Sequence, residues 1–271
     1  MTVLQLALSD TPLRHEWAHL RTSLRRGAKT PEGKIALEAY RPASLRAARA
    51  AWARRLAAEH RSATVFSGLL PQLIEAGAPL DFQAVVLRMA MEELRHGELC
   101  AAVVEALGGV AEVEVERVTE VVAEHADCTP RVRALRNVIY ASCISETVSV
   151  SLTTAERGHT EEPRIAQVLD QLLGDEVLHA RFGWLYLGVA LPCLDASERA
   201  AVQAYLPFAL QHYVERVAPS ASGPVPDGEM RERLRLGVGP GELYAEILND
   251  TLDEVVVPRL ASFGLEVGSW R

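Results

Sequence analysis

The sequence predicts an all-α fold: a four-helix bundle with one long crossover connection and additional N- and C-terminal helices. Apolar residues recur at helical spacing over four long segments, whereas the alternation typical of strands appears only briefly, near "VEVERVTEVV". Short connections join the first segment to the second and the third to the fourth, which favours two antiparallel hairpins. About twenty residues, 109–128, separate the second segment from the third, and this length predicts the crossover.

The first hairpin is expected to consist of helices at 43–75 and 81–107. The first follows Pro42, and an apolar stripe runs along it. The second opens at Asp81, a candidate N-cap, and ends at the glycine pair that begins with Gly108.

The second hairpin is expected at 130–157 and 163–190. Thr129 is a good N-cap, and Pro130 suits the first helical position because its missing N–H would have no partner there. The last core helix should stop before Pro192.

We expect the whole chain, 1–271, to form a single domain around a core bundle at 43–190. The stretch "PSASGPVPDG" reads as a loop because it is rich in Pro, Ser and Gly. Extra helices are expected at 13–26, 196–217 and 241–264, the last ending or kinked near Pro258.

Composition excludes several classes of function. A net charge of −8 argues against nucleic acid or an anionic membrane as a partner, and no segment is apolar enough to span a membrane. The N-terminal residues do not resemble a secretory signal. The four cysteines lack metal-type spacing and suit reduced thiols, so we expect a cytoplasmic location. They are Cys100, Cys128, Cys143 and Cys193.

Six ionisable residues interrupt the apolar stripes of the four core helices. Each of two helices contributes one inward Glu, and each of the other two contributes Glu-x-x-His, whose i,i+3 spacing places both side chains on one face. This is the ligand set of a carboxylate-bridged dinuclear metal site. The candidate ligands are Glu59, Glu93, His96, Glu146, Glu176 and His179.

The expected depths of the carboxylates agree. At about 1.5 Å per residue, Glu59 and Glu93 lie roughly 22 and 18 Å from their shared turn. Glu146 and Glu176 lie roughly 16 and 20 Å from theirs. All six ligands can therefore meet at one level of the bundle.

The charges also balance. Four carboxylates and two neutral imidazoles carry −4, which two divalent cations neutralise in a medium of low dielectric constant. Carboxylate and imidazole ligands suit iron or manganese better than a thiolate-selecting metal, while zinc stays open. The alternative is a buried salt-bridge network. Glu-x-x-His alone is weak evidence, since Glu16–His19 and Glu156–His159 share it, and we expect neither pair to bind metal.

Each metal-site Glu of the two motifs is preceded by another acid. A ligating histidine usually donates its second N–H to a carboxylate. We therefore expect Asp175 to support His96 and Glu92 to support His179, across the bundle. The alternative is that these acids are solvated or paired with arginines, for which Arg95 and Arg181 are candidates.

With these motifs, residues 43–190 resemble the ferritin-like non-haem diiron oxidases and oxygenases, including acyl-carrier-protein desaturases, multicomponent monooxygenases and arylamine N-oxygenases. The resemblance implies two iron ions, or manganese and iron, with O₂ as co-substrate. It also implies that Glu93 and Glu176 bridge the metals, that Glu59 and Glu146 are more terminal, and that each histidine caps one metal. A homodimer is a further expectation of the family.

Departures from the family pattern narrow the range of activities that the resemblance implies. Cys100 occupies the place of the radical tyrosine of ribonucleotide reductase, and Leu172 that of the third histidine of the arylamine N-oxygenases. Rubredoxin-type CxxC pairs are absent. A substrate cavity is expected near Glu146, with glycines leaving room beside the histidines or serving close helix packing. Its candidate residues are Ser142, Cys143, Ser149, Val150, Gly97, Gly183 and Cys100.

The leading functional hypothesis is a dinuclear iron, or Mn/Fe, O₂-activating oxidoreductase, a monooxygenase or oxidase that acts on a small organic substrate. Its electrons would come from a separate donor or reductase. One alternative is a ferroxidase or peroxide-scavenging protein without an organic substrate, favoured if side chains fill the space beside the metals. Another is a metal-free helical interaction protein whose core contains a salt-bridge network.

Overall fold

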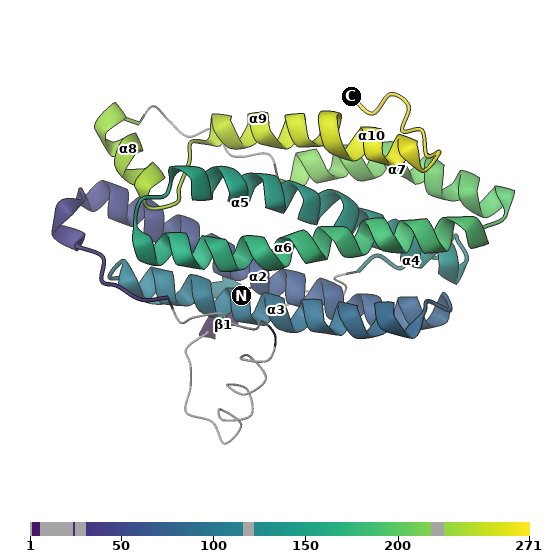
Figure 1. The fold of residues 1–271 in the computed structure, drawn as a ribbon, viewed down its shortest axis with the longest axis horizontal. Coiled ribbons are helices and arrows are strands. Elements are labelled where there is room, and N and C mark those ends of the chain that lie inside the picture. Colours follow the sequence, from purple (N-terminus) through teal and green to yellow (C-terminus); the bar gives the residue numbers. More distant parts are fainter. Residues whose placement is uncertain (1, 6–23, 25–30, 116–121, 218–224) are drawn as a thin grey trace, which may run out of the picture.

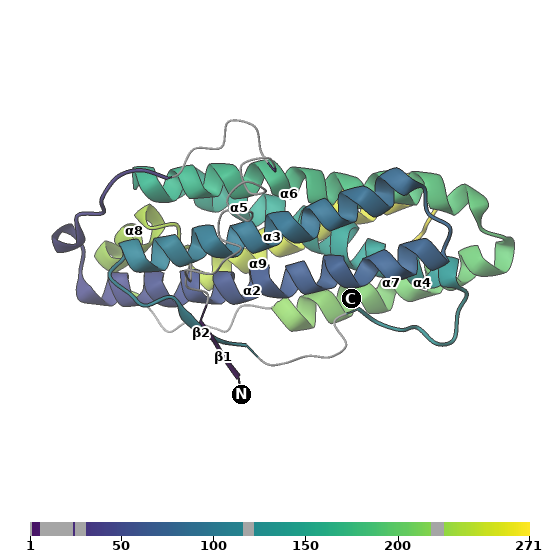
Figure 2. The ribbon, with the colours of Figure 1, turned by 90° about the horizontal axis from the view of Figure 1, so that it is seen from below.

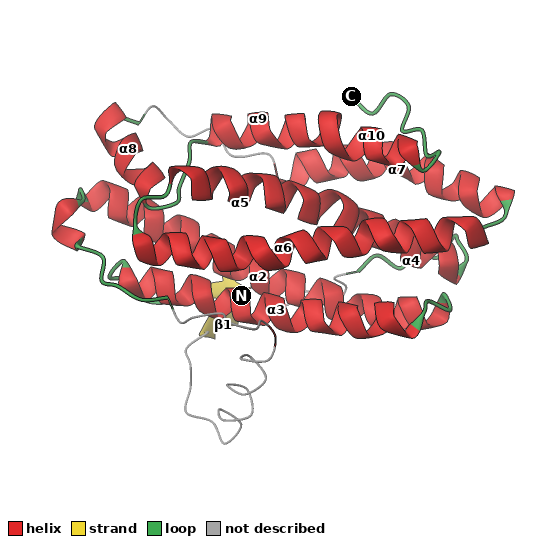
Figure 3. Ribbon diagram, viewed as in Figure 1, coloured by secondary structure: helices red, strands yellow, loops and turns green. Residues whose placement is uncertain are grey.

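The computed structural model of the protein describes residues 2–5, 24, 31–115, 122–217 and 225–271. The described chain is predominantly helical, which confirms the predicted class (Figure 3). None of its helices has the length and apolar character needed to cross a membrane. Of the helix expected at 13–26, only Leu24 lies within the described residues.

The first hairpin consists of α2 (Pro42–Glu75) and α3 (Leu80–Ala106), within one residue of the predicted bounds. Pro42 occupies the first turn of α2, where a missing N–H has no cost. The turn between the helices passes through Gly77 at a φ of +71°, a left-handed conformation that glycine adopts without steric strain.

The second hairpin contains α4 (Pro130–Val138), the π-helical segment η2 (Ile139–Glu146) and α5 (Thr147–His159), followed by α6 (Pro163–Ala190) and the 3₁₀ turn η3 (Leu191–Cys193). The predicted helix at 130–157 is thus present but not regular. A π-helical stretch shifts the side chains that follow it around the helix axis, and such stretches are frequent at functional sites. Here the stretch ends at Glu146, a candidate ligand.

The two hairpins pack side by side, with α3 against α6 and α2 against α4 (Figures 1 and 2). The end of α3 lies beside the beginning of α2, where Arg49 Nη1 donates to the Gly108 carbonyl at 3.2 Å. The beginning of α4 lies beside the end of α2, where Arg133 is 3.5 Å from Glu75. The chain between α3 and α4 therefore crosses the length of the bundle, as its length predicted.

A short β ribbon in this connection departs from the expected fold. β2 (Glu112–Val115) pairs antiparallel with β1 (Thr2–Gln5), and β2 packs beside α2. β2 falls in the segment whose alternation suggested a strand. The ribbon ties the beginning of the chain to the crossover.

The helices expected at 196–217 and 241–264 are present. α7 spans Ala196–Val217 and packs against α4. The C-terminal helix is divided into α9 (Gly241–Thr251), the π-helical segment η4 (Leu252–Val256) and α10 (Val257–Ser262). The interruption precedes Pro258, where a kink was expected, because proline removes one backbone donor. α9 covers α5 (Figure 1).

α8 (Asp227–Arg235) was not predicted; it begins at the last two residues of "PSASGPVPDG", the stretch expected to be a loop, of which residues 219–224 lie outside the described chain. Acidic residues in its first turn and arginines in its last turn complement the helix dipole. Glu232 fixes α8 to the beginning of α2 by accepting a hydrogen bond from Ser44 Oγ at 2.6 Å and by pairing with Arg41. A tertiary contact therefore stabilises a helix that composition alone does not predict.

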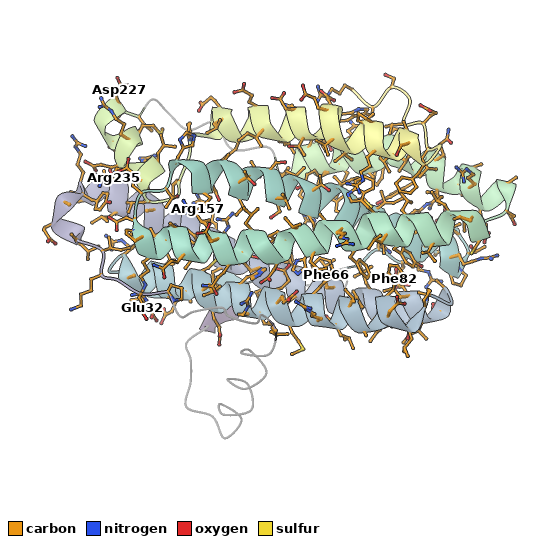
Figure 4. All side chains as sticks on the ribbon, viewed as in Figure 1. Glu32, Phe66, Phe82, Arg157, Asp227 and Arg235 are labelled. Carbon is orange, nitrogen blue, oxygen red and sulfur yellow. The ribbon has the colours of Figure 1, made fainter. Side chains whose placement is uncertain are left out.

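The apolar core consists of two clusters, separated along the bundle axis. One contains Phe66 of α2 and Met89 of α3, and the other contains Leu56 and Cys100 of the same helices. Figure 4 labels Phe66, whose ring lies 5.5 Å from that of His179. Between the two clusters the same helices contribute buried charged residues, so the polar site occupies a layer enclosed on both sides by apolar packing.

Candidate metal centre

The six candidate ligands meet in that layer. They form two groups, and within each group one potential ligand atom per residue lies within 4.8 Å of the others. All six are buried, with exposed fractions between 0% for the histidines and 8% for Glu59. The first group is Glu59, Glu93, His96 and Glu176, and the second is Glu93, Glu146, Glu176 and His179.

Glu93 and Glu176 belong to both groups. The two oxygens of Glu93 lie 3.6 Å from His96 Nδ1 and 2.9 Å from His179 Nδ1. Those of Glu176 lie 3.6 and 3.8 Å from the same two atoms. Each carboxylate thus divides its oxygens between the two histidines, which is the arrangement that a bridging ligand needs.

Glu59 and Glu146 lie at opposite ends of this arrangement. Glu59 Oε2 is 3.7 Å from His96 Nδ1, and Glu146 Oε2 is 4.0 Å from His179 Nδ1. They are the most exposed members of the set, at 8% and 5%. Each can therefore serve only its own group.

The Nε2 atoms of the two histidines, which point away from the centre of the site, contact the expected acids. His96 Nε2 lies 3.1 Å from Asp175 Oδ2, and His179 Nε2 lies 3.1 Å from Glu92 Oε2. These contacts confirm the predicted pairing across the bundle. They also orient both Nδ1 atoms toward the carboxylates, because a carboxylate at Nε2 favours the tautomer with its proton there.

The alternative that Glu92 and Asp175 pair with arginines is compatible with their pairing to the histidines. Arg95 forms a buried ion pair with Asp175, and Arg88 Nε donates to Glu92 Oε1 at 2.8 Å. Arg181, the other candidate named from sequence, is exposed. The supporting acids therefore each hold a histidine and an arginine at the same time.

Several buried atoms that face the centre of the site have no partner in good hydrogen-bond geometry, although His179 Nδ1 lies 2.9 Å from Glu93 Oε1. They include both carboxylate oxygens of Glu93, Oε2 of Glu176 and Nδ1 of each histidine. Buried polar atoms are rarely left unpaired in folded proteins because the loss of water is costly. The orphaned atoms are hard oxygen and imidazole nitrogen donors, so they fit divalent iron or manganese.

The protonation of the site in the absence of metal reflects an excess of negative charge. Burial raises the pKa of Glu146 to about 8, and burial together with the nearby Glu146 carboxylate raises that of Glu176. Burial alone lowers the pKa of a histidine, but facing carboxylates outweigh it here and raise the pKa of His96 to about 9 and of His179 to about 10. In the metal-free site, protons on these carboxyl and imidazole groups therefore offset the negative charge that bound cations would otherwise neutralise.

Two residues beside the ligands were missed by the sequence analysis. Arg55 of α2 lies 3.7 Å from Glu59 and 2.8 Å from Glu156 of α5. Arg88 contacts Glu92. Each arginine precedes its acid by four residues, a spacing that places both on one helix face and that could have identified the pairs.

Tyr213 of α7 was also missed. Its side chain is buried, hydrogen-bonds Ser145 and lies within the electrostatic reach of Glu146 and Glu176. Sequence spacing contains no signal for this contact, because α7 lies outside the four helices of the repeated motif.

The expected substrate residues are largely packed. Ser142 and Cys143 are fully buried, and a Cβ added to Gly183 would meet Ser142 Cβ at 2.6 Å and the Cys143 backbone N at 2.9 Å. Gly183 therefore serves close packing of α6 on η2, which corrects the expectation that it leaves room for a substrate. A Cβ on Gly97 would make an ordinary contact with Leu56 at 3.5 Å.

Cys100 belongs to the apolar cluster around Leu56, where its small side chain is fully buried, so it does not line an open pocket. Ser149 and Val150 are partly exposed on α5, one turn beyond Glu146. These two residues are the expected pocket residues that solvent reaches.

Of the two other Glu-x-x-His pairs, the one in the described part of the chain, Glu156–His159, does not join the site. His159 is exposed at the end of α5, and Glu156 pairs with Arg55 and accepts a hydrogen bond from Tyr244 at 2.9 Å. Glu16–His19 lies outside the described residues.

No family model matches this chain, and no curated protein matches it.

Proposed function

We propose that the protein is a ferritin-like non-haem dinuclear iron, or Mn/Fe, oxidoreductase that activates O₂ as a monooxygenase or oxidase of a small organic substrate. The observation that carries the proposal is the sharing of Glu93 and Glu176 between two four-residue groups. A mononuclear site would not need two shared carboxylates. A salt-bridge network would give both Nδ1 atoms well-aligned hydrogen bonds, which neither atom makes.

The chain's own residues divide the work at such a centre. Glu93 and Glu176 would bridge the metals, while Glu59 with His96 and Glu146 with His179 would complete one position each. Bound iron supplies the reactivity toward O₂ and electron transfer. Glu92 and Asp175 hold the histidine tautomers, and Phe66 excludes water on the His179 side.

The connectivity supports the ferritin-like assignment. Two antiparallel hairpins joined by a connection that crosses the bundle is the arrangement used by carboxylate dimetal proteins of this type. The order of ligands along the chain, Glu then Glu-x-x-His in each hairpin, fits the same arrangement.

The proposal is tested by metal loading and reaction with O₂. We expect the purified chain to bind two ferrous ions, and anaerobic loading followed by O₂ to produce new near-ultraviolet or visible absorption with oxidation of both ions. Glu93→Ala should abolish the response, whereas Glu16→Ala, at a Glu-x-x-His pair that precedes the core segment 43–190 in the sequence, should leave it unchanged. Two ferrous ions that never react with O₂ would rule out oxygen activation.

A ferroxidase or peroxide-scavenging function is the second candidate. It is favoured by the packing of Ser142 and Cys143 against Gly183, which fills space expected for a substrate. Turnover of O₂ with ferrous iron alone, unaffected by a panel of organic amines, acids and phenols, would favour this function. Stimulation of O₂ uptake by one of these compounds, with its oxidised product, would favour the oxygenase.

The third candidate, a metal-free interaction protein, makes a different prediction. Its histidines would be protonated and paired with carboxylates, as their raised pKa values allow without metal. Protein purified under anaerobic conditions and supplied with ferrous iron would then hold no metal after gel filtration.

A further inference from the structure

The two halves of the site are supported by arginines in unequal surroundings. Arg95, which immediately precedes His96, is 3% exposed and pairs with Asp175 inside the protein. Leu178 takes the corresponding place before His179, so no arginine follows the same pattern in the other half. Glu92 instead pairs with Arg88, which lies one turn earlier on α3 and has a side chain that is 48% exposed.

Arg88 has a second anchor that is distant in sequence. Its Nη2 donates to the backbone carbonyl of Leu24 at 3.0 Å, while its Nε donates to Glu92. Leu24 is only 8% exposed, so its side chain is packed against the protein. One guanidinium group therefore connects the docked backbone at Leu24 with the carboxylate that holds His179.

The chain of contacts continues from Arg88 through Glu92 to the candidate ligand His179. Glu92 is fully buried and uses one oxygen for Arg88 and the other for His179 Nε2 at 3.1 Å. Displacement of Arg88 would leave this buried carboxylate without its cationic partner. Water or a shift of the side chain would then compensate, and either would weaken the orientation of the imidazole.

We propose that Arg88 is a positioning residue that makes metal retention at the His179 position depend on its contact with the Leu24 carbonyl. The inference rests on the proposed metal centre. The His179 position, made of Glu93, Glu146, Glu176 and His179, is the exchangeable one, and the position capped by His96 is the retentive one. A displacement of the Leu24 carbonyl would thereby alter metal occupancy at one position only.

Ionic strength should separate the two positions. Salt screens an ion pair that solvent reaches more strongly than one that is fully buried. The Arg88 contact joins a half-exposed arginine to a buried carboxylate, so salt reaches it more easily than the Arg95 contact, in which both partners are buried. Salt should therefore speed metal loss from the His179 position and leave the His96 position almost unaffected.

The test uses the full chain loaded anaerobically with ferrous iron and mixed with an excess of a chromogenic ferrous chelator. We expect two release phases of equal amplitude. Arg88→Gln and Leu24→Glu should each speed the faster phase about 10-fold or more, the effect typical of losing outer support of a ligating histidine. The rate of the slower phase should change by less than about twofold, well below the effect of losing the hydrogen-bond partner of a ligating histidine.

Two controls separate positioning from general destabilisation. Arg181→Gln removes an exposed arginine two residues from His179 and should leave both phases unchanged. Arg88→Lys keeps a cation near Glu92 and should restore part of the retention. The faster phase of the wild type should respond to salt, and that of Arg88→Gln should not.

The outcomes distinguish this inference from the proposed function. Wild-type release in Arg88→Gln, or equal acceleration of both phases, would overturn the inference while two bound ions per chain still supported the metal centre. A wild-type chain that binds no ferrous iron would overturn both.

Discussion

The imidazole rings of His96 and His179 face each other across the bundle, with centroids 5.8 Å apart and planes tilted by 34°. Each ring directs Nε2 to an acid from the opposite hairpin and leaves Nδ1 among the shared carboxylates. The two hairpins therefore build halves of one site, and neither half is complete alone, because Glu93 and Glu176 come from different hairpins.

The shared carboxylates should be more important for metal binding than the terminal ones. Glu93→Ala removes a ligand from both positions, so we expect it to hold almost no ferrous iron after gel filtration. Glu146→Ala removes a ligand from the His179 position alone and should retain about one ion per chain after gel filtration, since that position is weakened while the other keeps all four of its ligands. Metal analysis by mass spectrometry measures both. Equal losses in the two variants would contradict the assignment of Glu93 as a bridging ligand.

The metal-free protein should lose stability as the pH rises. The folded-state pKa values of His96 and His179, about 9 and about 10, exceed the unfolded value near 6.5. Their stabilisation is therefore complete below pH ~6.5 and is lost as the pH rises through the folded values. The raised pKa of Glu146, about 8, acts in the same direction above pH ~4.3.

Urea denaturation of the chelator-treated protein at pH 6.5 and pH 9.5 checks this expectation. We expect the free energy of unfolding to fall by several kcal/mol over this interval, at about 1.4 kcal/mol per unit of difference between the folded and unfolded pKa values. Glu146→Gln should reduce the fall, because its side chain no longer titrates. A metal-free protein that becomes more stable over the same interval would contradict the assigned shifts.

The helices and the six-residue set could be predicted because they depend on local periodicity. Apolar spacing, Pro42, Thr129 and Gly108 determine where helices begin and end, and the i,i+3 spacing of Glu and His fixes a common face. The pairing of Glu92 with His179 followed from chemistry, since a ligating histidine needs an acceptor at its second nitrogen.

The features that were missed depend on tertiary structure. The π-helical stretch of η2 changes hydrogen bonding without changing residue types, so the apolar pattern gives no warning of it. α8 is stabilised by Glu232 contacts to α2, although Pro, Ser and Gly precede it. Gly183 illustrates the limit most clearly: whether a glycine leaves space or permits close packing depends on the helix opposite.

Gly183 provides a direct test of the packing between α6 and η2. An alanine there would place Cβ 2.6 Å from Ser142 Cβ and 2.9 Å from a backbone nitrogen, so the helices must separate. We expect Gly183→Ala to cost about 1–3 kcal/mol of unfolding free energy, the usual range for overpacking. Gly158→Ala is the matched control, because nothing lies within 4 Å of its added Cβ. That variant should gain up to about 1 kcal/mol from helix propensity. Equal stability of both variants in urea would show that space exists beside Gly183.

The buried pair of Arg95 and Asp175 should behave differently from an exposed ion pair. Arg95→Leu leaves the Asp175 carboxylate, itself 3% exposed, without its cation, and we expect a loss of about 3–5 kcal/mol in the metal-free protein. The double variant Arg95→Leu/Asp175→Leu removes both charges and should recover much of that loss, because apolar replacement of a buried pair is often close to neutral. It should nevertheless bind iron more weakly than the wild type, since His96 then lacks an acceptor at Nε2. Urea denaturation and metal analysis of the same three proteins therefore separate the contribution of Asp175 to stability from its contribution to the metal centre. A double variant as unstable as Arg95→Leu would show that Arg95 acts through contacts other than Asp175.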